Sequence, residues 1–348
     1  MARAVFHIGG HKTGTTYLQN LFHHNARALA RAGLYYPDIG PNTAHHVLAR
    51  PWLSMNDVPD SFFRKNPPDA LWDGLIQRYA KAPGTLFLSG ENFSRAYPES
   101  VDMQELAQRL SAFEDVRVIY TMRDAAQAVQ SLWLQVAKSN RKIGLYSYVR
   151  KAIEQRRAIG VWIDHNAVYD SLLRGFDAEQ IYFFDYSALR RARGGIAQAL
   201  LDAMEIDVQV SDLVLPPDAE ANISPDPLGF WITSQITGLD TPDASLIDAV
   251  TKPLRATGRP NTLLARHEHV KIASRYGATN TKLVERLQAT QPGFTFEECV
   301  LPEDMIYREE IPNLVWLQIA QAAYQAQKSK PAHTTFFGRV GAKVKAPK

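Results

Sequence analysis

The stretch that decides the fold is Gly9-Gly10-His11-Lys12-Thr13-Gly14-Thr15-Thr16, which follows a short apolar run at residues 4–8. That run, ending in two glycines, predicts a buried strand, and apolar residues from Leu18 to Leu29 recur at helical spacing, which predicts a helix up to about residue 31. The spacing Gly9-x4-Gly14-x-Thr16 is that of a phosphate-binding loop, in the strand–loop–helix context that such a loop requires. Amide groups at the helix start favour an anion, and glycines let the main chain approach it closely.

The position of the lysine sets this loop apart from the loops of nucleoside triphosphatases. Those loops place a lysine directly after the second glycine, where it reaches the β- and γ-phosphates. Here Thr15 holds that place and the lysine is Lys12, which indicates a shorter anion with its leaving group elsewhere. The sequence offers only Asp124 and Asp185 as weak candidates for a magnesium-binding aspartate at a strand end.

Composition and charge describe an ordinary globular protein. The chain has 348 residues, of which 45% are hydrophobic and 22% charged, enough for a sizeable core. No apolar run approaches the roughly 20 residues that cross a bilayer, and residues 3–8 are too short for a signal peptide. Cys299 is the only cysteine, so we expect a reducing, cytoplasmic location without stable membrane insertion. A net charge of +3 is too small to indicate a nucleic-acid partner.

Strands and helices alternate along most of the chain. This alternation predicts a parallel sheet with right-handed crossovers. We predict one α/β domain over residues 1–325, with an irregular insertion at 37–83 and a mainly helical part at 222–325 packed on the sheet. Residues 326–348 are basic and predict a disordered tail. The further strands are predicted at 85–89, 116–122 and 181–184, and the helices at 103–113, 125–138, 145–158, 165–175 and 195–204.

The segment Lys12-Thr13-Gly14-Thr15-Thr16, with Leu18 two residues on, resembles the 5′-phosphosulfate loop of P-loop-type sulfotransferases. The longer stretch from His7 to Gln19 is similar to their bacterial branch. The resemblance implies three layers, a parallel sheet with helices on both faces, and sulfuryl transfer from 3′-phosphoadenosine 5′-phosphosulfate without a metal. It also implies that the donor binds Gly10, His11, Lys12, Thr13, Gly14, Thr15 and Thr16.

A second element supports the resemblance. The family binds the 3′-phosphate of the donor with an arginine at a strand end and a serine eight residues later. Here the strand at 116–122 ends in Arg123, and Ser131 follows at that spacing, about two helical turns along. The family's usual proline and second arginine are replaced by Ala125 and Ala128. The family also uses a late basic loop, which Lys271 or Arg275 would supply.

Transfer of a sulfuryl group to a hydroxyl needs a cation for the leaving phosphate and benefits from a base. Lys12 is the expected cation. Glu91 matches by position the glutamate that serves as base in glycan sulfotransferases, so a carbohydrate acceptor is expected. His45 and His46 are rival bases, because an imidazole titrates near neutral pH.

The sequence leaves two alternative functions open. The glycine spacing also suits a P-loop kinase, although Thr15 stands where its lysine should be. A non-catalytic glycan-binding protein on the same fold is the third possibility. We expect no metal site, because the histidine pairs lack cysteine or paired-carboxylate partners at ligand spacing.

Overall fold

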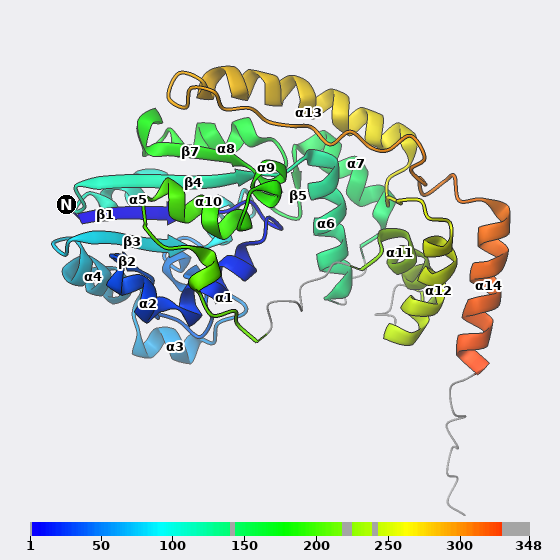
Figure 1. The fold of residues 1–348 in the computed structure, drawn as a ribbon, viewed down its shortest axis with the longest axis horizontal. Helices are drawn as coiled ribbons and strands as arrows, with labels where there is room; N and C mark the ends of the chain where they lie inside the picture. Colours follow the sequence, from blue (N-terminus) through cyan, green and yellow to red (C-terminus); the bar gives the residue numbers. More distant parts are fainter. Residues whose placement is uncertain (1, 140–142, 218–224, 239–242, 329–348) are drawn as a thin grey trace, which may run out of the picture.

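The computed structural model describes residues 2–139, 143–217, 225–238 and 243–328, and its centre is a five-stranded parallel sheet (Figure 1). Every neighbouring pair of strands in this sheet is parallel. The parallel α/β fold expected from the alternating pattern is therefore confirmed. In spatial order the strands are β2 (Leu34–Tyr35), β3 (Gly84–Ser89), β1 (Ala2–His7), β4 (Asp115–Met122) and β7 (Ile181–Asp185).

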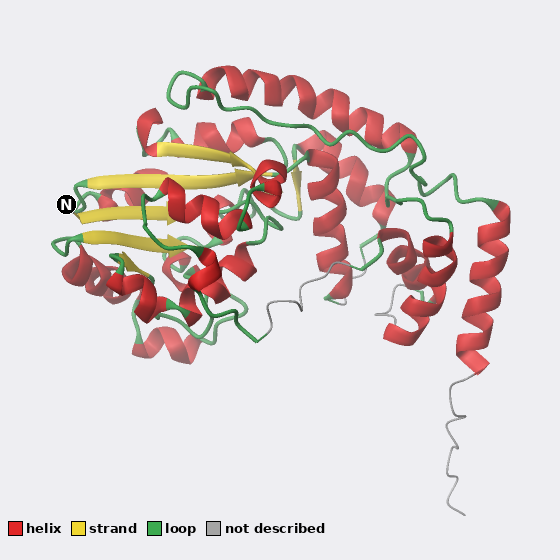
Figure 2. Ribbon diagram, in the orientation of Figure 1, coloured by secondary structure: helices red, strands yellow, loops and turns green. Residues whose placement is uncertain are grey.

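Successive side chains of the strands enter two different apolar cores, which makes the fold three-layered. Val5 and Ile119 pack with α1 (Thr15–His24), α2 (Ala26–Arg31) and α10 (Gly195–Ala203). Phe6 and Val118 point the other way, into a core with α4 (Pro68–Tyr79), α5 (Met103–Leu110) and α8 (His165–Leu172). Figure 2 shows the helices that enclose the strands. Because helices cover both faces of the sheet, the sequences of its strands are nearly continuous apolar runs.

The remaining helices lie beside the sheet or extend away from it. α13 packs against α6, α7 and α8, and α11, α12 and α14 share an apolar core of their own. No helix in the described ranges is long and apolar enough to span a membrane. The predicted tail lies outside the described residues from position 329 onward. The bounds are α3 Asp60–Lys65, α6 Ala125–Lys138, α7 Leu145–Gln155, α9 Tyr186–Arg191, α11 Pro227–Ile236, α12 Ala244–Ala256, α13 Arg266–Leu287 and α14 Asn313–Lys328.

Two local predictions are wrong, each because of a contact with a distant segment or an unusual backbone conformation. The single helix expected up to residue 31 is broken at Asn25, whose side chain bonds the carbonyl of Leu21 and both main-chain groups of Val214. The helix expected at 145–158 ends at Gln155. Positive φ angles at Arg156 and Ile159 then turn the chain into a hairpin of β5 (Arg157–Ala158) and β6 (Val161–Trp162).

An irregular segment, residues 288–305, returns along α13 toward α14 and passes the carboxyl ends of β4 and β7 (Figure 1). Its main chain binds the ends of two strands. The amide of Cys299 donates to Asp124 Oδ2 at 3.2 Å, and the amide of Glu297 donates to Asp185 Oδ2 at 3.4 Å. This segment thus borders the carboxyl edge of the sheet, where ligands bind in open α/β folds.

Candidate active site

The glycine loop leaves the sheet at its centre, directly after β1. Positive φ angles at Gly9, Lys12 and Gly14 fold it tightly against β4. A Cβ on Gly10 would lie 2.2 Å from the carbonyl oxygen of Thr121, so only glycine fits there. The hydroxyl of Thr13 donates to the carbonyl of Gly10 at 2.6 Å and closes the loop.

The helix that follows presents its amino terminus to this loop. Neither a side-chain cap nor an acidic residue occupies the first turn of α1 among the residues described. Its first N–H groups therefore keep their hydrogen-bonding capacity, and the helix dipole makes this end attractive to an anion. Lys12 adds a positive charge, and partial burial together with Lys138 and Arg123 lowers its pKa below the ordinary value.

Arg123 joins the second predicted element to this loop. Its Nη1 donates to the carbonyl of Lys12 at 2.5 Å and to the hydroxyl of Ser131 at 3.1 Å. The ring of Tyr186 lies 5.2 Å from its guanidinium carbon. Burial lowers the pKa of Arg123. The structure therefore brings together the two segments that the sequence singled out.

One edge of the Arg123 guanidinium has no partner among the residues that the structure describes. Its Nε is buried without a hydrogen bond, and its Nη2 has none to any described residue. These two nitrogens form the fork that binds two oxygens of a phosphate or carboxylate. An anion at this edge would satisfy a buried donor that is otherwise costly to leave unpaired.

A cavity of about 320 Å³ opens beside Arg123. Arg190 is its second cation, with a guanidinium carbon 5.8 Å from the ring of Tyr186. His269 of α13 also lines it, whereas Lys271 and Arg275 are exposed on that helix and do not. Neither Arg190 nor His269 is among the site residues expected from the sequence. Arg190 follows shortly after the strand predicted at 181–184, and this position could have indicated it.

Glu91 links three segments at the neighbouring strand end. It begins a short 3₁₀ helix (Glu91–Ser94) directly after β3. One carboxylate oxygen accepts from the hydroxyl of Thr15, and the other lies 3.0 Å from Nε2 of His46. Burial alone would raise the pKa of Glu91, but bonds from His46 and Thr15 and nearby positive charge hold it below its usual range. The carboxyl group is therefore ionised.

The histidines around Glu91 differ in which nitrogens are available. His45 has both engaged, since its Nε2 lies 2.8 Å from the carbonyl of Pro37 and its Nδ1 accepts from the amide of Ser89. Burial lowers the pKa of His45 to about 4. His11 has a buried Nε2 without a partner among the described residues, and burial likewise lowers its pKa to about 4. His46 has an Nδ1 with no hydrogen bond in the described part of the chain.

His46 also borders an open cavity of about 480 Å³. This cavity begins at Thr16 on the first turn of α1, next to the glycine loop. Most of its other lining residues carry amide, hydroxyl or carboxylate groups. They are Gln19, Asn20, Pro41, Asn42, Thr43, Ala44 and Asp57.

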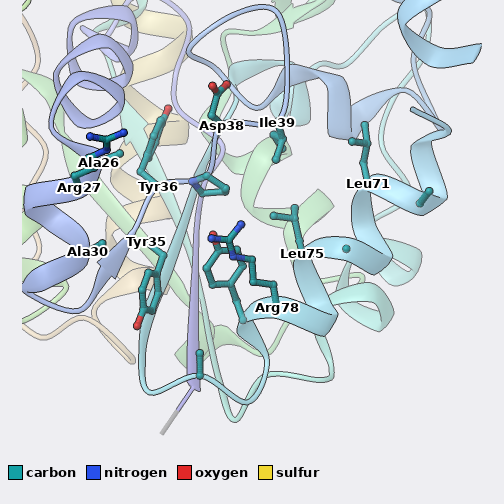
Figure 3. Close-up of a pocket in the computed structure, with 15 residues that line it drawn as sticks. Ala26, Arg27, Ala30, Tyr35, Tyr36, Asp38, Ile39, Leu71, Leu75 and Arg78 are labelled. Carbon is teal, nitrogen blue, oxygen red and sulfur yellow. The ribbon is translucent and has the colours of Figure 1, made fainter. Parts of the chain in front are cut away.

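A larger groove of about 680 Å³ lies between α2, β2 and α4 (Figure 3). Arg27 and Arg78 line it together with tyrosines and alanines. It contains neither the glycine loop nor Arg123. This groove and the cavity beside Thr16 have no lining residue in common. Neighbouring parts of one segment line them, 35–39 the groove and 41–46 the cavity, and within it the hydroxyl of Tyr36 donates to the carbonyl of Thr43 at 2.7 Å.

A central strand, a tight glycine loop and a helix start without a side-chain cap lie together at the carboxyl edge of the parallel sheet. A family model described as the sulfotransferase domain matches residues 3–215, which is more than half of the sequence. The chain therefore belongs to the sulfotransferase family.

Two solved structures are similar to this chain. A sulfotransferase from Alicyclobacillus acidocaldarius is 16% identical with a TM-score of 0.39, and the match covers 68% of this chain and 91% of that one. The sulfotransferase domain from the curacin biosynthetic pathway is 13% identical with a TM-score of 0.34, over 65% and 77% of the two chains. None of the curated proteins matches the sequence.

Proposed function

We propose that the protein transfers a sulfuryl group from 3′-phosphoadenosine 5′-phosphosulfate to a hydroxyl of a carbohydrate acceptor. One observation carries the choice of donor: Arg123 Nη1 lies within hydrogen-bonding distance of both the Lys12 carbonyl and the Ser131 hydroxyl. Two anion-binding elements therefore share one edge of the sheet. A nucleotide with phosphate groups at both its 3′ and 5′ positions suits this pair, whereas ATP has no 3′-phosphate to bind Arg123.

The residues of the glycine loop bind and neutralise the 5′ end of this donor. Amide groups from Gly10 to Thr16 and the charge of Lys12 face the phosphosulfate. As the bond to sulfur breaks, these groups stabilise the negative charge that grows on the 5′-phosphate. Arg123 and Ser131 hold the 3′-phosphate, and Arg190 adds a second cation to the same cavity.

The proton of the acceptor hydroxyl passes to the pair formed by Glu91 and His46. Glu91 remains the proposed base, because its carboxylate lies beside Thr15 of the loop, although its lowered pKa makes it a weaker base than an ordinary carboxylate. His46 is the rival, because its Nδ1 is available and the residue lines the polar cavity. His45 suits this role poorly, because the main chain occupies both of its ring nitrogens.

The nature of the acceptor is proposed from the cavity beside Thr16. Most of its lining residues carry amide, hydroxyl or carboxylate groups, which exchange hydrogen bonds with sugar hydroxyls. The cavity is open, so a reacting sugar could carry further units outside it. The groove in Figure 3 lies across the segment at 36–46 and offers two arginines to such units.

A thermal-shift titration tests the donor. Adenosine 3′,5′-bisphosphate at about 100 times its dissociation constant should stabilise the fold by about 2.7 kcal/mol. ATP with Mg²⁺ should do much less. Stabilisation by ATP and Mg²⁺ without any by the bisphosphate would instead support the kinase reading.

Single-turnover sulfuryl transfer to sugar acceptors then distinguishes Glu91 from His46 as the base. The same assay distinguishes an enzyme from a non-catalytic glycan-binding protein. If Glu91 is the base, Glu91→Gln should lower the transfer rate far more than His46→Gln, while both variants still bind the bisphosphate. A larger loss in His46→Gln would assign the proton to the imidazole. Absence of transfer to any sugar, with tight bisphosphate binding, would count against the carbohydrate acceptor.

A further inference from the structure

A buried histidine, His165, contacts the main chain of Arg123. It is the first residue of α8 and is 4% exposed. Its Nε2 lies 2.9 Å from the carbonyl oxygen of Arg123, and its Nδ1 lies 3.2 Å from the hydroxyl of Tyr120. The imidazole therefore joins α8 to two positions near the carboxyl end of β4.

These two contacts determine which ring nitrogen carries the proton. Burial lowers the pKa of His165, so the ring is neutral near pH 7 and has one N–H group. The carbonyl of Arg123 can only accept a hydrogen bond, so Nε2 donates to it. Nδ1 then accepts from the hydroxyl of Tyr120. With both nitrogens engaged, the ring holds its neighbours in place and offers no free nitrogen to a substrate.

The carbonyl of Arg123 lies just beyond the sheet. β4 ends at Met122, which forms the last pair of the β4–β7 ladder with Asp185. No other hydrogen bond to the Arg123 carbonyl occurs among the described residues. His165 therefore fixes the main chain where it leaves the sheet, which is also where the Arg123 side chain begins.

Hydrogen bonds from α13 hold α8 in its own place. Asp164 caps α8 by accepting from the amide of Asn166 at 3.1 Å. The side chain of Asn166 donates to the carbonyl of Thr279, and Arg286 donates to Asn166 Oδ1 at 3.0 Å. Figure 1 shows α13 running along α8. These bonds give the imidazole a fixed base from which to hold the strand end.

We propose that His165 is a positioning residue for the 3′-phosphate of the donor. By holding the Arg123 carbonyl, it sets where the guanidinium lies beside Ser131 and directs the free edge formed by Nε and Nη2 toward the phosphate. A misplacement of about 1 Å in a binding group can cost about 100-fold in rate. The inference rests on the proposed donor, because it concerns the phosphate that Arg123 binds.

Isothermal titration with two nucleotides tests this role. The wild-type protein should bind adenosine 3′,5′-bisphosphate more tightly than adenosine 5′-phosphate. His165→Leu should weaken the bisphosphate by roughly 10-fold or more and the 5′-phosphate by less than about twofold, since only the bisphosphate reaches Arg123.

Two conservative variants separate the hydrogen bond from the shape of the ring. His165→Gln should restore most of the preference for the bisphosphate, because the amide nitrogen of glutamine can take the place of Nε2. His165→Asn should lose the preference as His165→Leu does, because its amide is too short to reach the Arg123 carbonyl.

A matched control separates positioning from stability. Leu172 is fully buried on the same helix, about two turns from His165. Leu172→Ala should also lower the urea midpoint, because it leaves a cavity in the core, but it should keep the preference for the bisphosphate. In an Arg123→Lys background, His165→Leu should cause little further loss of preference, since it acts through Arg123.

The role of His165 is refuted if His165→Leu keeps the wild-type preference or weakens both nucleotides alike. Additive losses of preference from His165→Leu and Arg123→Lys would also contradict it, because the two residues would then act independently. These results leave the proposed donor standing. A wild-type protein that shows no preference for the bisphosphate would overturn the donor and the role of His165 together.

Discussion

Replacement of Arg123 by lysine tests the two-phosphate site most directly. Lysine keeps the positive charge but loses the planar fork formed by Nε and Nη2. It also cannot hold the Lys12 carbonyl and the Ser131 hydroxyl in the way that Nη1 does. The variant should therefore bind a 3′-phosphate with at least one fewer charge-assisted hydrogen bond.

The size of the effect follows from that lost bond. A hydrogen bond to a charged group contributes about 1.5–3 kcal/mol. At 1.4 kcal/mol for each factor of ten, loss of one such bond weakens adenosine 3′,5′-bisphosphate by roughly 10- to 100-fold. Adenosine 5′-phosphate has no 3′-phosphate, so its affinity should change little.

Isothermal titration of both nucleotides against wild-type and Arg123→Lys protein measures this difference. Arg117→Lys is the control, because Arg117 lies near the start of β4, at the opposite end of that strand from Arg123, and its Nε pairs with Asp115 Oδ2 at 3.2 Å. Equal losses for the two nucleotides would mean that Arg123 only supports the loop. An unchanged affinity for the bisphosphate would remove Arg123 from the donor site altogether.

Three further outcomes can be checked in the same laboratory. Lys12→Ala should lower the rate of sulfuryl transfer about 10²- to 10³-fold, because it removes a group that stabilises charge in the transition state. Lys65→Ala, at an exposed position of α3, is the control and should have no effect. Similar transfer rates in both variants would contradict the role of Lys12. Gly10→Ala should destabilise the protein by about 1–3 kcal/mol and abolish nucleotide binding, because its Cβ would collide with the carbonyl of Thr121. In urea titrations Gly74→Ala, whose added Cβ would meet open space, should leave stability unchanged or raise it. A Gly10→Ala variant with wild-type stability and nucleotide binding would refute the close contact with the Thr121 carbonyl. Acid should also destabilise the fold. Three buried histidines have a pKa of about 4 in the folded protein, whereas in the unfolded chain they bind protons below about pH 6.5. The free energy of unfolding should therefore fall as the pH drops from 6.5 to 4, by up to about 1.4 kcal/mol per pH unit for each histidine. Equal urea midpoints at pH 7 and pH 5 would contradict it; the groups are His7, His11 and His45.

Much of the fold could be predicted because its signals are local. A buried parallel strand appears as a short apolar run, and the strands that include Val5, Leu88 and Val118 were found in this way. The two residues of β2 carry too little pattern to be recognised, since an edge strand of that length depends on its pairing with β3. The break at Asn25 escaped prediction for a similar reason, because its partner Val214 is 189 residues away in sequence.

The amino-acid sequence alone determined the glycine loop, its displaced lysine and the arginine–serine spacing, since each lies within a few residues of a single strand end. Only the tertiary structure decided what gathers around them. Parallel pairing of β1 with β3 brings the carboxyl ends of these strands together, so Glu91 meets Thr15 although 76 residues separate them. The same packing brings Arg190 and His269 to Arg123 and leaves Lys271 and Arg275 exposed, because the fold, and not distance along the chain, selects which side chains share a cavity.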